Sequence, residues 1–385
     1  MNGIWYYFIA FVLIWFFALV FKNKLTEHNV EVNFPVLMWK TQRLRGFIDR
    51  IAKRAPRFWR WYMNLGIFVC FGFMIFMTVV LFYSLQFITS TPSVSLIIPG
   101  VDVPGSTIYV PFVYGILGLA TVLIVHEFSH GILARVENVS IKSIGLLLFA
   151  IIPGAFVEPD EDEVKDISRG GRLRIYAAGS MANLMLALIA MIVVLLLSSA
   201  FVPMVFHEDG VAIDRVVSDS PADGVLKSGM VIESINGKSF NSSEGYINVV
   251  HDLKPNSTVN IVTDRGSFSF NLSENPNNKS IGYMGIQAVK HYAVNSGWDG
   301  YGLDSVLYCV FPIIQLFTWI FLLNFGIGTF NLLPMKPLDG GLMLEELLSY
   351  KLSEGKVKII VRVCSVVVLA VILVSLFASF ALAMS

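Results

Sequence analysis

The sequence has few charges and few cysteines for its length. Only 15% of its 385 residues are charged, against about a quarter in soluble domains. The formal net charge is +0, so nothing in the overall charge favours a nucleic-acid partner. Cys70, Cys309 and Cys364 all lie in apolar runs, which excludes a disulfide framework and a Cys-type zinc site. The apolar N-terminus lacks a basic start and a small-residue cleavage site, which predicts a retained anchor and not a removable signal peptide.

Apolar residues dominate instead. They make up 55% of the chain, and the mean hydropathy is +0.68, which is typical of membrane proteins. Crossing about 30 Å of hydrocarbon takes about 20 apolar residues in a helix. The sequence therefore predicts an α-helical polytopic membrane protein with about six transmembrane helices, at residues 3–21, 63–87, 110–133, 174–202, 305–330 and 359–384.

The distribution of Lys and Arg predicts the orientation of these spans. The loop 22–62 carries ten basic residues against three acidic ones, and residues 88–109 contain no Lys or Arg. Because basic loops stay on the cytoplasmic side, we expect 22–62 inside and both termini outside, in the plasma membrane. The basic, aromatic-rich loop is also a candidate to lie along anionic headgroups, although orientation alone explains its charge equally well.

Five regions follow from these spans. Residues 1–109 hold two transmembrane helices and the basic cytoplasmic loop, and residues 110–202 form the first part of the membrane core. An external domain occupies 203–300, a further core helix 301–345, and a last transmembrane helix 346–385. Within the core, the segment 144–157 is apolar but too short to cross the membrane, and Pro153-Gly154 interrupts it. It is expected to be a strand-turn or a re-entrant element packed against protein.

The external domain is expected to be small and rich in β-structure. Alternating runs at 211–217, 230–235 and 259–262 are separated by turn signals. Its sequence SPADGVLKSGMVIESINGKSF resembles a PDZ domain of the protease-associated kind. The resemblance implies binding of an extended peptide or a free peptide C-terminus by strand addition. A size filter and a spacer without a ligand are the alternatives.

The third span contains the motif His126-Glu127-Phe-Ser-His130. Positions i and i+4 of a helix lie about 40° apart around its axis, so both imidazoles can hold one metal ion. Glu127, beside the first histidine, is placed to take a proton from water. Ionisable groups at membrane depth are costly and indicate function. Histidines that only bridge helices, or a noncatalytic metal site, are the alternatives.

A catalytic zinc site usually takes three protein ligands. The other four histidines lie in loops or in the external domain, at 28, 207, 251 and 291. Asp339 follows the fifth span in the stretch NLLPMKPLDGG, where prolines and glycines predict locally unwound backbone. Such a stretch would let Asp339 turn toward the histidines.

Together these motifs resemble the site-2 protease family of intramembrane metalloproteases. The resemblance covers about 110–345 and rests on HEFSH, on NLLPxxPLDGG and on the Gly-x-x-x-Asn signature at 179–183. It implies a Zn²⁺ ion held by His126, His130 and Asp339, and Glu127 as general acid and base. It also implies Asn183 near the substrate peptide, with helix packing as the alternative, and sheet structure beside the cleft that pairs with substrate.

The expected function is hydrolysis of peptide bonds in or near transmembrane segments of membrane proteins, in regulated intramembrane proteolysis. Its partners would be these substrates and the bilayer, with no nucleic acid. A metalloprotease that trims lipidated C-termini is one alternative, disfavoured by the Leu338-Asp339-Gly340 stretch. A proteolytically silent scaffold that holds partners through the PDZ-like domain is another, and an intact Glu127 disfavours it.

Overall fold

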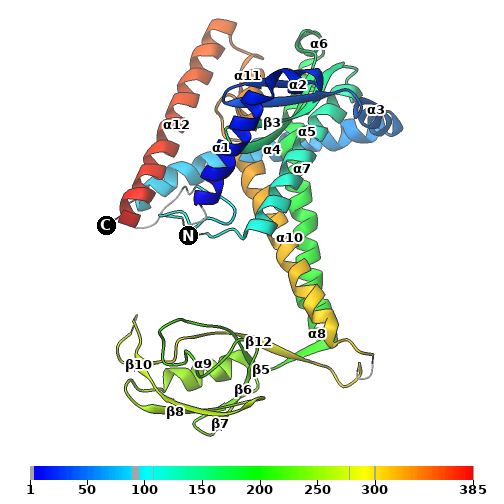
Figure 1. Ribbon diagram of the computed structural model, residues 1–385. Helices are drawn as coiled ribbons and strands as arrows, with labels where there is room; N and C mark the ends of the chain where they lie inside the picture. Colours follow the sequence, from blue (N-terminus) through cyan, green and yellow to red (C-terminus); the bar gives the residue numbers. More distant parts are fainter. Residues whose placement is uncertain are drawn as a thin grey trace. The chain divides into compact units, whose positions relative to one another are not determined.

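The computed structural model describes residues 4–88, 94, 96–106, 108–276, 278–298 and 301–384. The chain divides into two compact units (Figure 1). The first, the membrane unit, comprises 1–194 and 315–385, and the second, the β-rich unit, comprises 195–314.

Five described helices are long and apolar enough to cross a membrane. They are α4 (Pro56–Ser84), α5 (Phe112–Val136), α7 (Arg169–Leu196), α10 (Asp304–Phe330) and α12 (Glu354–Met384). The polytopic helical fold is thereby confirmed. The sixth predicted span forms α1 (Ile4–Val20), whose 17 residues reach about 25 Å at 1.5 Å per residue. It is shorter than the hydrocarbon layer is thick.

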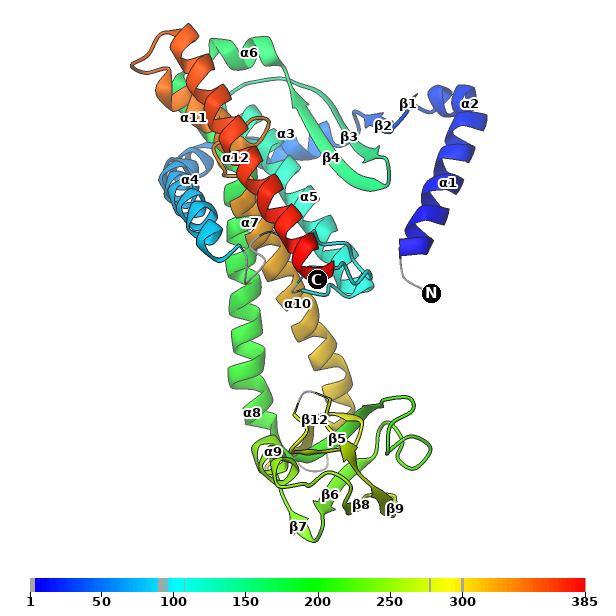
Figure 2. The same ribbon diagram turned by 90° about the vertical axis from the view of Figure 1, so that its left-hand side faces the viewer.

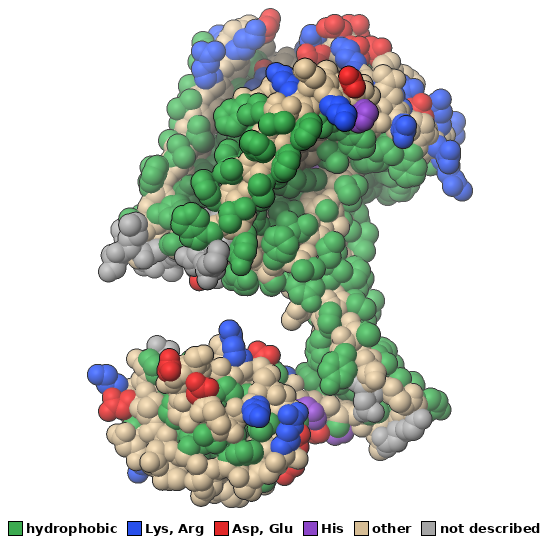
Figure 3. Space-filling view, in the orientation of Figure 1, with side chains coloured by type: hydrophobic (Ala, Val, Ile, Leu, Met, Phe, Trp, Pro, Cys, Tyr) green, Lys and Arg blue, Asp and Glu red, His purple; other side chains and the backbone are tan. Residues whose placement is uncertain are grey.

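Shorter helices connect these elements. They are α2 (Lys22–Glu27), α3 (Arg45–Arg54), η1 (Leu85–Phe87), α6 (Glu161–Asp166) and α11 (Asp339–Leu348). Charged side chains gather at the end of the membrane unit where α3, α6 and the start of α12 lie, and hydrophobic side chains cover the face below them (Figure 3). This separation suits a helical unit with one end in water and its flanks in lipid.

A four-stranded antiparallel sheet belongs to the membrane unit (Figure 2). Its order is β1 (Val30–Asn33), β2 (Val36–Thr41), β3 (Ile141–Phe149) and β4 (Ile152–Pro159). The expected short element at 144–157 thus contains the strand-turn that was one of its two predicted forms. The β1–β2 hairpin lies in the loop 22–62, where the sequence analysis noted basic and aromatic residues but no strands. The indole N–H of Trp15 donates a 2.8 Å hydrogen bond to the carbonyl of Ala150 and ties α1 to the β3–β4 turn.

The β-rich unit contains a second antiparallel sheet, in the order β12-β5-β6-β8-β9. Its elements are η2 (Leu197–Phe201), α8 (Val202–Val205), β5 (Phe206–Val216), β6 (Val231–Ile235), β7 (Lys238–Ser239), α9 (Ser243–His251), β8 (Thr258–Thr263), β9 (Gly266–Asn271), β10 (Ser273–Glu274), β11 (Gly282–Tyr283) and β12 (Ile286–Val294). The three runs predicted as strands lie in β5, β6 and β8. Asn236 and Gly237 turn the chain between β6 and β7 at φ 49° and 76°, as their turn signal predicts.

Two ion-pair groups fasten the helices of the membrane unit. The guanidinium of Arg172 on α7 binds the Glu346 carboxylate on α11 with two contacts, of 2.7 and 2.9 Å. Glu137, after α5, accepts hydrogen bonds from Arg60 on α4 and from Arg174 on α7. The first pair matters for the site, because α11 begins with Asp339.

We predict that Glu346→Ala destabilises the membrane unit by about 3 kcal/mol, since removing one partner leaves a largely buried guanidinium without its counter-ion. The thermal unfolding midpoint of the detergent-solubilised protein measures this effect. Glu354→Ala is the matched control, because the Glu354–Lys358 pair is exposed and should contribute little. Equal midpoints for the two variants would contradict the role given to the Arg172–Glu346 pair.

Candidate metal centre

The two histidines of the motif lie on one face of α5, as their spacing predicts. Their Nε2 atoms are 3.2 Å apart. The ring of His130 is fixed from behind, because its Nδ1 lies 2.7 Å from the carbonyl oxygen of Ile175 on α7. A carbonyl only accepts, so Nδ1 carries the proton and donates. The lone pair of Nε2 in a neutral His130 therefore faces away from Ile175, as a metal ligand requires.

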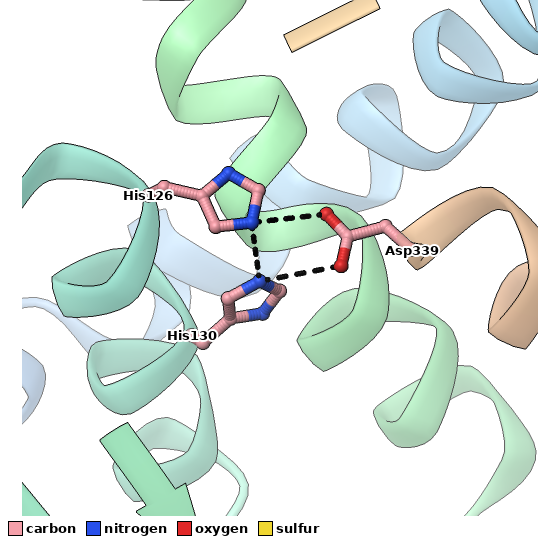
Figure 4. A group of neighbouring side chains, drawn as sticks. All are labelled: His126, His130 and Asp339. Carbon is pink, nitrogen blue, oxygen red and sulfur yellow. Dashed lines mark hydrogen bonds and ion pairs between the residues drawn. The ribbon is translucent and has the colours of Figure 1, made fainter. Parts of the chain in front are cut away.

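Asp339 reaches the histidines from a distant part of the sequence. Helix α10 ends at Phe330 and α11 begins at Asp339, so the intervening proline-containing stretch is not helical. The amide N–H of Gly340 donates a 2.9 Å hydrogen bond to the carbonyl of Asn331, which closes this loop. The carboxylate of Asp339 faces both imidazoles (Figure 4), with each oxygen 3.4 Å from one Nε2. The Ser180 hydroxyl donates to the same carboxylate at 2.8 Å.

The donor atoms of these three residues lie close enough together to hold one ion. The two Nε2 atoms are 3.2 Å apart, and each lies 3.4 Å from a different oxygen of Asp339. With one ligand atom from each residue, all three lie within 4.8 Å of one another. Neutral imidazoles and a carboxylate are also the donor types that zinc accepts. The three residues form a group that could hold a metal ion, and all three line one cavity.

Glycine at position 179 makes room for this arrangement. A Cβ atom there would lie 2.6 Å from Nε2 of His126 and overlap the ring of His130 as well. Helix α7 can therefore approach the histidine face of α5 only where it has no side chain. The Gly-x-x-x-Asn signature thus contributes a close helix contact in addition to its asparagine.

Glu127 faces a cavity of about 790 Å³ that the metal group also lines. Its Oε2 accepts a 3.1 Å hydrogen bond from the backbone N–H of Val157 on β4. The cavity wall also includes residues from α6, α7 and the 331–338 loop, among them Lys165, Tyr176 and Asn331. Glu127 is therefore held beside the metal group and at the edge of a strand. Sequence reasoning did not identify the roles of Ser180 and Ile175, because only tertiary contacts reveal them, and it placed Val157 only in the sheet element expected beside the cleft.

Asn183 is fully buried and lies behind His126, and it is not among the residues that line the cavity. Its Nδ2 is 3.2 Å from Nδ1 of His126. Its Oδ1 has no hydrogen-bond partner among the described residues. The structure therefore brings His126, His130, Asp339 and Glu127 to one cavity and places Asn183 in contact with a metal-group histidine.

Comparison with known proteins agrees with this site. The model of peptidase family M50 matches residues 114–372, about two thirds of the chain, and the chain belongs to this family. The resemblance to site-2 proteases is thereby confirmed. Together with its apolar helices, the family identifies an integral membrane protein of the metalloprotease class.

Individual relatives cover less of the chain. An uncharacterised protein of Methanocaldococcus jannaschii is 29% identical over 236 residues, which is 60% of this chain and 56% of that protein. A membrane-bound transcription factor site-2 protease homolog of Arabidopsis thaliana is 32% identical over 127 residues, or 31% of this chain and 25% of that protein. The chain therefore spans about half the length of one relative and a quarter of the other.

Solved structures match part of the chain. The PDZ domain of an SdrC-like protein from Listeria monocytogenes is 31% identical, covers 22% of this chain and 90% of that domain, and has a TM-score of 0.20. The corresponding domain from Listeria innocua is 32% identical, covers 22% of this chain and 94% of that domain, and has a TM-score of 0.19.

We predict that Gly179→Ala weakens zinc binding by about tenfold or more, because the new methyl group displaces both imidazoles. Metal stoichiometry and a competitive zinc titration of the purified protein measure the effect. Gly326→Ala on α10 is the control, since a Cβ atom there meets no atom within 4 Å. Unchanged zinc affinity in Gly179→Ala would refute the packing role of Gly179.

Proposed function

We propose that the protein is a zinc metalloendopeptidase that cuts membrane proteins within or beside their transmembrane segments. The observation that carries this proposal is the convergence of His126, His130 and Asp339 on one point beside Glu127. A zinc ion at this position would supply Lewis-acid chemistry, activating water and polarising the scissile carbonyl. The remaining chemistry falls to side chains of the chain itself.

Glu127 is the proposed general base and acid. Its carboxylate would accept a proton from the attacking water and pass it to the leaving amine. The hydrogen bond from the Val157 N–H holds the Glu127 carboxylate between the metal group and β4. A substrate that lies along β4 would therefore present its backbone next to Glu127.

We assign Asn183 a positioning role toward His126. For Nε2 of a neutral His126 to bind metal, Nδ1 must carry the ring proton and donate a hydrogen bond. Rotating the Asn183 amide by 180° would bring Oδ1, now without a partner, into place to accept that hydrogen bond. Polarisation of the substrate peptide, the role implied by the family resemblance, would instead require the amide to face the cavity.

The proposed substrates are membrane proteins with transmembrane helices, and the proposed setting is regulated intramembrane proteolysis in the plasma membrane. The basic loops support an orientation with the metal group toward the cytoplasm and the β-rich unit outside. A carbonyl in an intact helix is already hydrogen-bonded, so the substrate must unwind locally before it can be cut.

For the β-rich unit we propose peptide binding along β12. This strand ends the sheet order, and among the described residues it pairs with β5 alone, which leaves its other edge as a candidate for strand addition. An extended peptide or a free C-terminus of a membrane protein suits such an edge. In the alternative in which the chain is a proteolytically silent scaffold, binding of partners along β12 would be its function.

We predict that Glu127→Gln lowers the rate of cleavage of a model transmembrane substrate by about 10²- to 10⁴-fold, because the variant lacks the proton acceptor. Bound zinc should remain at the wild-type stoichiometry, since Glu127 is outside the ligand set. Cleavage and metal content are measured on the same detergent-solubilised preparations. Undiminished cleavage by the variant would exclude Glu127 as the base, and a metal-free, inactive wild type would favour the scaffold.

Replacing residues 207–293 with a short Gly-Ser linker tests the role of the β-rich unit. Phe206 and Val294 are cross-strand partners, so their backbones lie about 5 Å apart and a short linker can rejoin them. We expect the variant to cut substrates with bulky external domains that the full chain rejects. An identical substrate range for both proteins would eliminate the size-filter role.

A further inference from the structure

The chain carries five N-glycosylation sequons, the pattern Asn-x-Ser or Asn-x-Thr in which x is not proline. The asparagine of each sequon is exposed. Asn138 follows α5 in the membrane unit, and the other four belong to the β-rich unit, at positions 241, 256, 271 and 278. Asparagine is frequent in this part of the chain, so the number of sequons carries no conclusion by itself. The surroundings of each side chain distinguish them.

In two sequons the third residue is engaged elsewhere. After Asn138, the Ser140 hydroxyl donates a 3.0 Å hydrogen bond to the Glu163 carboxylate. After Asn241, Ser243 is the first residue of α9, and its backbone N–H donates to a carboxylate on β5. Among the described residues, neither serine therefore bonds the asparagine of its own sequon.

Two further sequons are joined to each other across a pair of strands. Asn271 ends β9, and its Oδ1 accepts a 2.8 Å hydrogen bond from the Thr258 hydroxyl on β8. Thr258 is the third residue of the Asn256 sequon and the cross-strand partner of Asn271. The hydroxyl of one sequon thus satisfies the carboxamide of the other, and neither sequon has its own two groups together.

The sequon at Asn278 differs, because it forms a turn of its own. Oδ1 of Asn278 accepts hydrogen bonds from the backbone N–H of Ser280 at 3.1 Å and from the Ser280 hydroxyl at 2.6 Å. An asparagine bonded to the backbone two residues on forms an Asx turn. The N–H of Ile281 donates to the carbonyl of Asn278 at 3.1 Å and closes the turn. These contacts stay within 278–281, so the turn needs no distant partner.

This turn leaves the reactive nitrogen of Asn278 accessible. A backbone N–H only donates, so the carboxamide atom that faces the N–H of Ser280 is the oxygen. The other atom, Nδ2, has no hydrogen-bond partner among the described residues. Asn278, Lys279 and Ser280 are all exposed. An enzyme that recognises a sequon can therefore reach its carboxamide and its hydroxyl together.

We propose that Asn278 is a site of N-linked glycosylation. The donor class is an oligosaccharide linked to a polyprenyl phosphate. In the transfer, Nδ2 forms a bond to C1 of the first sugar, and the bond from C1 to the phosphate oxygen breaks. The polyprenyl phosphate leaves with the electron pair of that bond. Nδ2 gives one proton to the transferring enzyme, and nothing is oxidised or reduced.

Sequons are acceptors in chain segments exposed on the external side of the membrane. The inference therefore rests on the proposed external placement of the β-rich unit, and it is independent of the proteolytic activity. A glycan is bulky and hydrophilic. At this turn it would keep the surrounding surface of the β-rich unit in water.

Peptide mass spectrometry of the full chain, purified from the membranes of the cells in which it naturally occurs, tests the proposal. We expect the peptide that contains Asn278 to carry the mass of an oligosaccharide and the Asn138 peptide to carry none. Asn278→Gln should remove this mass, and so should Ser280→Ala, which leaves the asparagine in place. Ser280→Thr is the matched control, because it keeps the hydroxyl and should keep the glycan.

The placement of the β-rich unit is tested on the same cells with a membrane-impermeant, amine-reactive label. Lys227 and Lys53 are both exposed, the first in the β-rich unit and the second in the loop 22–62. We expect Lys227 to be labelled and Lys53 to be protected. An unmodified Asn278 with Lys227 labelled, or a glycan that persists in Ser280→Ala, would overturn the glycosylation site. Labelling of Lys53 and not Lys227 would instead refute the external placement, and the site with it.

Discussion

The membrane unit depends on the meeting of two imidazoles and a carboxylate at one buried point. Charged or polar groups taken out of water are costly unless a partner satisfies them. Here each Nε2 lies 3.4 Å from an oxygen of Asp339, and the outer atoms are held by Ile175, Ser180 and Asn183. Three of these contacts come from one helix, α7. The Gly179 gap allows α7 to approach closely enough to provide them.

Asp339 requires a second constraint, because α11 follows a non-helical loop and must turn the Asp339 carboxylate toward the histidines. The carboxylate stands at the first position of α11, and Glu346 follows it two turns later. Both point to α7, where Ser180 binds the first and Arg172 the second. The Ser180–Asp339 and Arg172–Glu346 contacts follow one another in opposite directions along α7 and α11. Together they fix the position of α11 and its rotation about its own axis. A single contact at Asp339 would leave that rotation free.

Local sequence signals predicted the groups that a helix or a turn brings together. The i, i+4 spacing of His126 and His130 needs only an α-helix, and the proline and glycine residues around Asp339 indicated an unwound stretch. The β1–β2 hairpin was not predicted, because β2 also pairs with β3, about a hundred residues away, and Lys40 lies near the end of β2. The first span was predicted at 3–21, and its described part forms α1 at Ile4–Val20. Asn183 was identified by motif, but its contact with His126 follows only from the packing of α7 on α5.

Glu127 stands where two different surroundings meet. On one side the cavity beside the metal group is lined by Lys165, Lys336 and Asn331, polar groups that suit water. On the other side a groove of about 440 Å³ between α5 and the sheet is lined by apolar side chains. The proposed hydrolysis within a bilayer would require such a boundary, since hydrocarbon excludes water and bulk water excludes a transmembrane segment. The proposed reaction would therefore take place where Glu127 meets both surroundings.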